Sequence, residues 1–577
     1  MKHRWLLAPP RPEEAAHLAR ELGITPLLGQ CLINRDFGST ERAQAFLGPR
    51  LRDLQDPFLL PNMAAAVDRL WAAREAGESL VIYGDYDVDG VTATALLAEV
   101  LETLGWRVAR FVPKRMDEGY GLSADGVENC LHQNRATLMV AVDCGSTATE
   151  TIRSLAERGI DVLVFDHHQI ADPPPVAVAL VNPRLGGDGA HGVELSSVGL
   201  SFKLAHALVK RGRERGMPEA VTFDLKTLLD LVALGTIADL VPLRAENRIL
   251  VRAGLERLNQ TQRPGLQALC EVAQITSTIG SYEVGFLLSP RLNAAGRLED
   301  ACEALDLLLT DDYGTATRLA RSLDARNRQR QQIEKAMADK VLGELDARFD
   351  PQSDYVIVEG AMPWHIGVVG IVASRVLQRF YRPTIIMGGD GECWRGSGRS
   401  IEGFDLAAAL RDCDDLLLRH GGHAMAAGLS LAPENLAMLR DRLNQLARDR
   451  LRPEQLRPPL RLDAAVPLGQ VTEEQVLDLD QLRPNGQGNP AVQLIVQGAR
   501  HDRPPQRVGK ERQHAKFWVT DGRLTREAIW YGAGDRPVPT EPFDLACVAH
   551  IHEFNHRRSV QLKVLDWRPA AKNGQRA

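Results

Sequence analysis

The sequence predicts an α/β protein of several domains, the first of which contains a parallel sheet. Two observations support this prediction. Between about residues 61 and 260, short apolar runs alternate with segments of helical periodicity, which is the order of βαβ units. At 577 residues, the chain is also too long to fold around one core, so three or four domains are expected.

Changes in this pattern along the chain give the predicted domain boundaries. The parts are, in order, an N-terminal helical segment (1–60), a parallel-sheet domain (61–260), a helical connector (261–349), a second, smaller α/β domain (350–457), a β-barrel resembling an OB-fold (458–570) and a tail (571–577). Within the connector, residues 311–349 predict one long helix whose polar middle suits a strut between two domains. The barrel is predicted from short, regularly spaced strands separated by Gly and Pro turns.

The composition is that of an ordinary soluble globular protein, with 44% hydrophobic and 25% charged residues. No apolar run is long enough to span a bilayer, and the first residues lack the apolar core of a signal peptide. The eight cysteines are scattered without a Cys-x-x-Cys pair, which argues against a disulfide framework and against a zinc ribbon. We therefore expect a cytoplasmic protein with no membrane partner.

Charge is distributed unevenly along the chain. The net charge is -6, yet residues 491–577 carry 15 Lys and Arg against 9 Asp and Glu, which is +6 and leaves -12 for the rest. A basic C-terminal part on an acidic body favours a polyanionic substrate such as nucleic acid. A solvated surface accounts for the charge alone nearly as well.

Four acidic sites recur along the first α/β domain, and the first three follow apolar runs that are typical of strands. The sites are Asp85, Asp87 and Asp89 after residues 79–84, Asp143 after 137–142, Asp166 with His167 and His168 after 161–165, and Asp239 after 228–235. Because ligands bind at the carboxyl ends of parallel strands, we expect these side chains to converge in one crevice. So many carboxylates need a counter-charge, which hard divalent cations supply.

The alternative for any one of these acids is a helix N-cap, because residues of helical periodicity (91–105) follow the first site directly. That alternative accounts for one aspartate but not for four sites. The tandem histidines predict a mixed nitrogen and oxygen site that suits Mn²⁺ better than Ca²⁺, with one imidazole as ligand and the other as an acid/base or phosphate-contacting group. Two cations about 4 Å apart would activate a bridging water for phosphoester or phosphoanhydride hydrolysis. No nucleophile elbow and no P-loop competes with this site.

A second set of residues suits the binding of a phosphate. Segment 396–400 (Gly-Ser-Gly-Arg-Ser) is expected to form a glycine-rich turn whose backbone approaches an anion, with Ser397, Arg399 and Ser400 as side-chain contacts. Further candidate contacts are Arg115, Arg291, Asn293, Arg297 and His423. An ordinary tight turn is the alternative for each glycine-rich stretch. The residues alone leave open whether the phosphate is terminal or internal.

The predicted barrel combines basic and aromatic residues, as OB-folds that bind single strands do. These residues are Lys510, Arg512, His514, Lys516, Phe517 and Trp518, then Phe554, Arg557 and Arg558. Phe517 and Trp518 are adjacent on a strand, so one of them should face the core and at most one can stack on a base. We take Lys516 and Trp518 as candidate DNA contacts.

These motifs resemble the DHH phosphoesterase superfamily, which is named for the triplet found here as Asp166-His167-His168. Within it, the chain is similar to the single-strand-specific 5′→3′ exonucleases of bacterial DNA repair. The motifs that carry this likeness are DYDVDG (85–90), EGYGLS (118–123) and LGTIADLVPL (234–243), with SPRLNAAGRLEDA (289–301), WHIGVVGIVASR (364–375), RGSGRS (395–400) and GGHAMAAGLS (421–430) resembling the family's DHHA1-like companion domain. The likeness extends from about residue 60 to 570.

The resemblance implies a two-metal-dependent exonuclease that degrades single-stranded DNA from its 5′ end to nucleoside 5′-monophosphates in DNA repair and recombination. The implied ligands of Mn²⁺ or Mg²⁺ are Asp85, Asp87, Asp89, Asp143, His167 and Asp239. Asp143 would bridge the ions, and His168 would contact the scissile phosphate or assist proton transfer. The resemblance also implies a single-strand-binding protein and a RecQ-type helicase as partners, and we expect a monomer.

The chain departs from the family pattern at three places. Tyr83 stands where many members have a metal-binding histidine, so Asp85 would supply that ligand, and Cys144 stands where Asn is common. Segment 484–490 lacks the Phe of a Phe-Gly motif, which puts a local contact in doubt.

Two other functions stay open. One is a small-substrate DHH enzyme acting on pyrophosphate, short oligonucleotides or cyclic dinucleotides, which would not need the basic extension from 458. The other is a non-catalytic DNA-binding scaffold, against which the intact acidic motifs argue.

Overall fold

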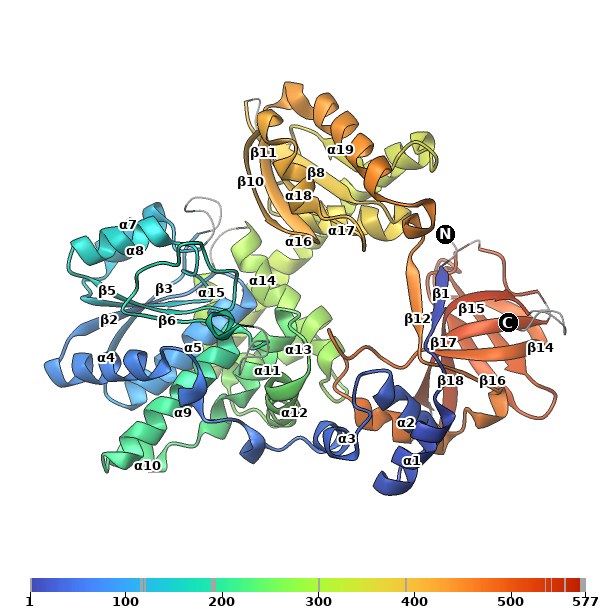
Figure 1. Cartoon of the computed structure of the whole chain (residues 1–577), viewed down its shortest axis with the longest axis horizontal. Helices are drawn as coiled ribbons and strands as arrows, with labels where there is room; N and C mark the ends of the chain where they lie inside the picture. The colour runs from blue at the N-terminus through green and yellow to red at the C-terminus, as the bar shows by residue number, and fades with distance from the viewer. Residues whose placement is uncertain are drawn as a thin grey trace. The chain divides into compact units, whose positions relative to one another are not determined.

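The computed structural model describes residues 3–114, 118, 121–187, 194–298, 301–389, 392–534, 536–540, 542–554 and 557–570 (Figure 1). The chain forms two compact units. The first unit comprises Pro49–Met337 and Pro484–Asn489, and the second comprises Met1–Gly48, Ala338–Arg483 and Pro490–Ala577. Each is described by itself.

The first unit is built on a sheet of five strands in the order β3-β2-β4-β5-β6. The strands are β2 (Ser79–Tyr83), β3 (Arg107–Phe111), β4 (Leu138–Val142), β5 (Asp161–Phe165) and β6 (Ala179–Val181). Every neighbouring pair is parallel. The central strand β4 is buried along its whole length, as in sheets covered on both faces. The predicted parallel sheet is confirmed.

Helices cover both faces of this sheet. On one face lie α4 (Met63–Ala76), α5 (Val88–Thr103) and α9 (Ser197–Glu214), and on the other lie α7 (Ala124–Gln133) and α8 (Thr149–Glu157) (Figure 1). Side chains alternate accordingly along each strand. In β2, for example, Leu80 and Ile82 join the core on the α5 side, while Val81 and Tyr83 join the core on the α7 side.

Further helices complete the first unit. They are α10 (Pro218–Thr222), α11 (Leu229–Ala238), α12 (Ala245–Leu258), α13 (Pro264–Val272), a π-helical turn (Glu283–Leu288), α14 (Ser289–Leu298) and α15 (Cys302–Leu309). The apolar α11 packs against α5, α9 and α12. The predicted long helix is α16 (Tyr313–Arg348), and the boundary between the two units falls inside it. None of the described helices combines the length and apolarity that a membrane span requires.

The second unit contains a mixed sheet of five strands in the order β10-β11-β9-β8-β7. These strands are β7 (Ile357–Gly360), β8 (Thr384–Gly389), β9 (Trp394–Arg399), β10 (Leu417–His423) and β11 (Ala426–Leu431). Only β7 and β8 run parallel among these described strands. The accompanying helices are α17 (Val369–Phe380), α18 (Leu406–Arg411) and α19 (Leu436–Arg450).

The same unit holds the predicted barrel. Its strands are β13 (Ala464–Val466), β14 (Leu494–Val508), β15 (His514–Thr520), β16 (Thr525–Trp530), β17 (Phe543–Phe554) and β18 (Arg557–Pro569). The order is β13-β14-β15-β16-β18-β17, and the additional pairing of β14 with β17 closes the sheet. Phe517 and Phe543 are fully buried at its centre.

The N-terminal segment packs with the barrel instead of forming a core of its own. It contains β1 (Arg4–Leu7) and the predicted helices α1 (Pro12–Leu22), α2 (Pro26–Ile33) and α3 (Thr40–Leu47), and β1 pairs in parallel with β12 (Pro459–Leu462). Leu18, Leu32 and Phe46 belong to the same buried cluster as Phe517 and Phe543, to which α20 (Glu473–Leu479) also contributes. Sequence patterns give no indication of this long-range packing.

Candidate metal centre

The four acidic sites of the first unit come together at the carboxyl ends of its strands. Asp85 follows β2, Asp143 follows β4, and the Asp166-His167-His168 triplet follows β5. Asp239 is the C-terminal cap of α11, the helix that packs against α5 and α9. The convergence expected for a parallel sheet is therefore present.

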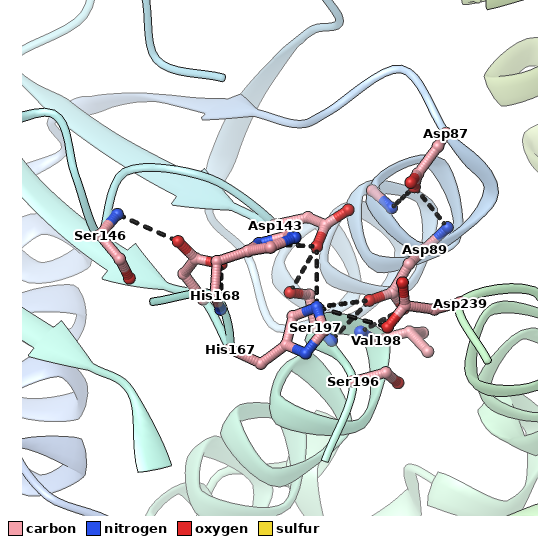
Figure 2. Close-up of polar contacts among 12 residues, drawn as sticks. Asp87, Asp89, Asp143, Ser146, His167, His168, Ser196, Ser197, Val198 and Asp239 are labelled. Carbon is pink, nitrogen blue, oxygen red and sulfur yellow. Dashed lines mark hydrogen bonds and ion pairs between the residues drawn. The ribbon is translucent and has the colours of Figure 1, made fainter. Parts of the chain in front are cut away.

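His167 lies at the centre of this cluster. Its Nε2 atom is 3.4 Å from Asp239 Oδ2, 3.6 Å from Asp143 Oδ1 and 4.0 Å from Asp89 Oδ2 (Figure 2). One imidazole and three carboxylates, supplied by different elements, thus face one small volume.

The potential ligand atoms form three overlapping groups, each with all atoms within 4.8 Å of one another. The groups are Asp89 with His167 and Asp239, Asp85 with Asp87 and Asp143, and Asp143 with His167 and His168. Asp143 and His167 each belong to two groups, so neighbouring centres share them. Carboxylate oxygens with imidazole nitrogen are a donor set that suits Mn²⁺, and the carboxylates alone suit Mg²⁺.

Two buried atoms of the cluster indicate that a cation fits there. His167 Nε2 and Asp239 Oδ2 are shielded from solvent, and neither has a hydrogen-bond partner among the described residues. A buried polar atom without a partner is costly. A divalent cation between them would give both atoms the missing partner, so the residues present fit the metal ions that the sequence predicts.

Three acids of the cluster, Asp89, Asp143 and Asp239, have raised pKa values in the absence of a counter-charge. Burial raises the pKa of Asp143 well above its usual value, and the charges of Asp87 and Asp89 add to this effect. Burial likewise raises the pKa of Asp89 to about 7 and that of Asp239 to about 9, with neighbouring carboxylates contributing in both cases. A bound cation reverses this preference, because it stabilises the ionised carboxylates.

The backbone around Asp143 is strained. Asp143 has φ 63°, in the left-handed region that non-glycine residues seldom adopt. Its Oδ1 accepts a hydrogen bond of 2.8 Å from the Ser197 hydroxyl. Such conformations persist where surrounding contacts hold them, and they concentrate at functional sites.

The N-terminus of α9 holds two of the acids. The backbone N–H groups of Ser197 and Val198 donate to the two oxygens of Asp89, over 2.6 and 2.9 Å, and the Ser197 side chain binds Asp143. The positive end of the helix dipole favours these negative charges. Sequence reasoning missed Ser197, because Ser196-Ser197 before a helix is also an ordinary capping pattern, and Ser196 is indeed the N-cap.

Asp87 differs from its neighbours in the first motif. It is the N-cap of α5, and its Oδ1 accepts from the N–H groups of Asp89 and Gly90 over 2.9 and 3.1 Å (Figure 2). The N-cap alternative is therefore correct for Asp87. Since a carboxylate has two oxygens, this cap leaves room for a second interaction with the group of Asp85 and Asp143.

Asp166 orients His168. His168 Nδ1 lies 2.7 Å from Asp166 Oδ1, while the other oxygen of Asp166 accepts from the Ser146 N–H over 3.0 Å. Burial acts against both charges, but the hydrogen bond and mutual attraction outweigh it, so the pKa of Asp166 falls below its usual range and that of His168 rises to about 9. His168 is thus a cation at neutral pH.

His167 has the opposite environment. Burial, together with the charge of His168, lowers the pKa of His167 to about 4, so its ring is neutral and able to bind a metal ion. Two residues that sequence reasoning did not single out hold the backbone of His167 and His168 in place. Arg184 donates to the His167 carbonyl over 2.8 Å, and Asn182 donates to the His168 carbonyl over 2.9 Å.

Of the predicted phosphate contacts in the first unit, two adjoin the acidic site. Asn293 and Arg297, on α14, line a pocket together with Asp85, Asp87 and Asp239. The helix comes this close because Gly296 leaves its backbone against Tyr86, where a Cβ would lie 2.8 Å from the Tyr86 carbonyl oxygen. Arg291 is engaged elsewhere, pairing with Asp324 over 3.0 Å. Arg115 lies outside the described residues.

The prediction of a glycine-rich turn at residues 396–400 is wrong. Residues 394–399 form β9, which pairs with β8 on one side and β11 on the other. The backbone N–H and C=O groups of β9 are therefore hydrogen-bonded within the sheet. The glycines are needed for packing, since a Cβ at 396 or 398 would lie 2.3 Å from Met387 or 2.4 Å from Leu406. Ser397 and Arg399 alternate with these glycines and therefore occupy the other face.

The remaining candidate phosphate contacts of this sheet differ in how free their side chains are to bind a ligand. Arg399 donates to the Ser397 hydroxyl and to the Gly398 carbonyl, each over 2.8 Å. His423 is exposed at the end of β10. It pairs with Ala426 of β11, which pairs with Arg399 of β9, so the three residues lie in one row across the sheet. The buried Ser400 hydroxyl donates a hydrogen bond to the Phe404 carbonyl over 2.6 Å. Its proton is therefore not available to a ligand.

In the barrel, one of the two adjacent aromatic residues faces the core, as predicted. Phe517 is fully buried, and Trp518 is partly exposed. The guanidinium of Arg503 lies 4.1 Å from the centre of the Trp518 ring, and Lys516 lies 5.2 Å from it. Lys516 is also ion-paired with Glu527 over 2.6 Å. The two cations thus lie over the Trp518 ring, in cation–π contacts.

Comparison with known proteins identifies relatives for all three folded parts. Family models match at residues 79–236 (DHH family, N-terminal domain), 353–449 (DHHA1 domain) and 462–566 (RecJ OB domain). The single-stranded-DNA-specific exonuclease RecJ of Bacillus subtilis is 36% identical over 571 residues, which cover 98% of this chain and 71% of that protein. RecJ of Escherichia coli is 36% identical, with 97% and 99% covered.

Solved structures agree with these sequence matches. The crystal structure of RecJ in complex with Mn²⁺ from Thermus thermophilus is 31% identical, with a TM-score of 0.84 and coverage of 100% of this chain and 81% of that one. The corresponding Mg²⁺ complex is 28% identical, with a TM-score of 0.79 and coverage of 98% and 79%. The predicted fold class is confirmed, with its parallel-sheet domain, smaller α/β domain and barrel.

Proposed function

We propose a mechanism that starts from one premise: this chain belongs to the RecJ family of single-stranded-DNA-specific exonucleases. It is accordingly a metal-dependent exonuclease of single-stranded DNA, with Mn²⁺ or Mg²⁺ as cofactor. We propose that it degrades DNA from the 5′ end to nucleoside 5′-monophosphates, in DNA repair and recombination.

The observation that carries the mechanism is the position of His167 among three carboxylates. We assign Asp89, His167 and Asp239 to one ion, and Asp85 with Asp87 to the other, because each set falls within one of the compact groups of ligand atoms. Asp143 shares a group with Asp85 and Asp87, and its Oδ1 lies 3.6 Å from Nε2 of His167 in the other set, so we assign it to both ions. When bound, the two ions would lower the pKa of a water and neutralise charge on the phosphate.

The residues around the ligands prepare this chemistry. Ser197 orients Asp143, and the N–H groups of α9 orient Asp89. We assign His168, which Asp166 keeps protonated, to contact with the scissile phosphate, where its positive charge would stabilise the negative charge of the phosphate. Asn293 and Arg297, beside the acids, are assigned to the same phosphate.

We assign recognition of the terminal 5′-phosphate to the face of β9 that holds the half-buried Ser397 and Arg399, beside Gly370 of α17. Ser397 holds Arg399 in a fixed orientation, and a fixed guanidinium binds phosphate through two parallel hydrogen bonds. His423 lies on the same line across the sheet and would add a third contact. In the barrel, Trp518 is assigned as a stacking platform for bases, with Lys516 and Arg503 beside it. Arg115 and Arg291 stay predictions from the sequence.

The cellular setting of this activity is inferred from the family resemblance and the cysteines. We propose that the enzyme acts in the reducing cytoplasm as a monomer, with a single-strand-binding protein and a RecQ-type helicase as partners. No disulfide joins any two of the eight cysteines, all of which lie among the described residues.

The test compares wild type, Asp143→Asn and the control Asp53→Asn, whose carboxylate is exposed in the same unit. Each is incubated with single-stranded DNA carrying a label at either the 5′ or the 3′ end, in Mn²⁺, Mg²⁺ or EDTA. We expect immediate release of a 5′-labelled mononucleotide by wild type and Asp53→Asn, and none in EDTA or by Asp143→Asn. Blunt duplex should resist all three proteins.

Other outcomes have distinct meanings. First release of the 3′ label would overturn the proposed polarity. If long DNA stays intact while dinucleotides or pyrophosphate are hydrolysed, the small-substrate function replaces the proposed one. DNA binding with no hydrolysis of any substrate would leave only a scaffold.

A further inference from the structure

Residues Pro484–Asn489 form a small hairpin that belongs to the first unit, although the chain on both sides of it belongs to the second. Gly486 and Asn489 exchange backbone hydrogen bonds of 2.9 and 3.1 Å, and the Asn489 side chain donates to the Pro484 carbonyl over 2.9 Å. Asn489 is fully buried. This segment, called the 484–489 hairpin below, is therefore a defined structure and not a slack connection.

The hairpin packs on the loop that follows Asp239. The Leu243 N–H donates to the Gln487 carbonyl over 2.8 Å, and Arg244 Nε donates to the Gly488 carbonyl over 3.1 Å. The two glycines of the hairpin permit this approach, because a Cβ at 486 would lie 2.7 Å from Leu243 and one at 488 would lie 3.0 Å from Pro242. The hairpin thus offers its backbone to the loop, and the loop contributes the Leu243 N–H and the side chains of Pro242, Leu243 and Arg244.

The loop held in this way is strained next to Asp239. It connects α11, which Asp239 caps, to α12, and both Leu240 and Ala245 have positive φ, at 60° and 41°. The Leu240 side chain, next to Asp239, is 71% exposed, whereas Leu243 is buried in the core and anchors the other end of the loop. On the side of α12, Asn247 donates to the Pro242 carbonyl over 3.0 Å. Strained backbone of this kind persists only when surrounding contacts hold it.

We propose that the 484–489 hairpin is a positioning element for the Asp239 carboxylate. The inference rests on the proposed role of Asp239 as a metal ligand. Asp239 lies one residue before the strained Leu240, and its Oδ2 is 3.4 Å from His167 Nε2. Metal ligands bind well only when neighbouring contacts hold them in place, so loosening this loop weakens the metal site.

The chain offers a matched pair of variants to test this. Gly488 and Gly498 both have positive φ, at 71° and 62°, so alanine introduces similar backbone strain at either position. A Cβ at 488 would meet Pro242 and Arg244, whereas one at 498, in β14, would meet nothing within 4 Å. Mn²⁺ binding to the metal-free full-length protein is measured by calorimetry, without DNA. We expect Gly488→Ala to weaken binding by about tenfold and Gly498→Ala to stay within about twofold of wild type.

A second variant approaches the same contact from the other side. Arg244 is exposed, so Arg244→Gln removes its hydrogen bond to the Gly488 carbonyl without altering the core. We expect Mn²⁺ binding to weaken by roughly threefold, as for loss of one hydrogen bond. The affinity of both variants for an oligothymidylate in EDTA should equal that of wild type. If Gly488→Ala does not fold, Arg244→Gln decides the question.

Asp239→Ala separates failure of this inference from failure of the proposed function. If Asp239→Ala loses Mn²⁺ affinity while Gly488→Ala and Arg244→Gln bind as wild type does, the positioning role is wrong and the ligand assignment stands. If Asp239→Ala binds Mn²⁺ as wild type does, the ligand assignment fails, and the inference fails with it.

Discussion

The Ser197 hydroxyl donates a hydrogen bond to Asp143 Oδ1 over 2.8 Å, and Asp143 is the carboxylate shared by two groups of ligand atoms. Ser197→Ala should leave Asp143 free to rotate and lower both kcat and Mn²⁺ affinity by about tenfold. Ser201→Ala is the matched control, because Ser201 is buried in the same helix and its hydroxyl has no hydrogen-bond partner among the described residues. Equal activity of the two variants would refute the orienting role of Ser197.

The pair of Asp166 and His168 predicts a pH dependence. Asp166 raises the pKa of His168 to about 9, so the imidazolium and the activity that needs it should be lost as the pH rises through that value. In Asp166→Asn, the pKa of His168 should fall toward its ordinary value of about 6.5, and the alkaline limb should move to lower pH. Rate profiles at saturating Mg²⁺ measure this shift. An unmoved alkaline limb would show that the His168 charge is not used.

The buried acids predict how metal removal affects stability. Asp89 and Asp239 have raised pKa values of about 7 and about 9, so the metal-free folded protein binds more protons than the unfolded chain between the ordinary carboxylate value and these values. Their contribution to stability is therefore present at low pH and is lost as the pH rises, and His168 acts in the same direction.

In EDTA, the Tm should accordingly fall by a few degrees between pH 6 and pH 8.5. Added Mn²⁺ should raise the Tm more at pH 8.5 than at pH 6, because it displaces fewer protons there. Scanning calorimetry measures both trends. A Tm that rises with pH in EDTA would contradict the assigned protonation of the acids.

Trp518 predicts where the barrel contacts DNA. Trp518→Ala should weaken binding of oligothymidylate by about 5- to 100-fold, the cost of one lost base stack, with kcat at saturating DNA unchanged. Trp518→Phe should recover much of the affinity, because it restores an aromatic face. Fluorescence anisotropy in EDTA measures the binding. If Trp518→Ala binds as well as wild type, this face of the barrel does not stack on bases.

Arg399 predicts the dependence on a terminal phosphate. Wild type should prefer DNA with a 5′-phosphate to DNA with a 5′-hydroxyl, and Arg399→Ala should lose that preference through a higher KM for the phosphorylated substrate. Arg411→Ala, at an exposed arginine of α18 in the same unit, serves as control. A preference that survives in Arg399→Ala would place the recognition of the 5′ end elsewhere.

Much of the metal centre could be predicted from the sequence, because its geometry follows from the sheet. Apolar strands that end in acids at 85, 143 and 166 place those acids at one edge, whatever the details of packing. Asp239 is the weakest of these predictions, since it follows a helix and joins the cluster only through the packing of α11 on α5 and α9. The position of an acid at the end of a strand can be predicted from local sequence, whereas the packing of one helix on others cannot.

The wrong prediction at residues 396–400 and the features that sequence reasoning missed have one physical origin. Glycine at 396 and 398 suggests freedom of the backbone, whereas the sheet uses it as space for Met387 and Leu406. Ser197 has the sequence context of a helix cap, yet its hydroxyl contacts a predicted metal ligand. In each case the side chain or its absence has a partner distant in sequence, which a local pattern does not reveal. The same holds for the 484–489 hairpin.

The shared core of the N-terminal helices and the barrel has a consequence for synthesis of the protein. Leu18, Leu32 and Phe46 pack in the cluster of Phe517 and Phe543. At about 5–20 residues per second, a ribosome needs roughly half a minute to one and a half minutes between Phe46 and Phe517. The first unit can fold in that interval, but α1, α2 and α3 must wait with their apolar faces uncovered. Helices α1, α2 and α3 are therefore made well before the barrel that covers them and are among the last parts to fold, so they are the part that chaperones would meet.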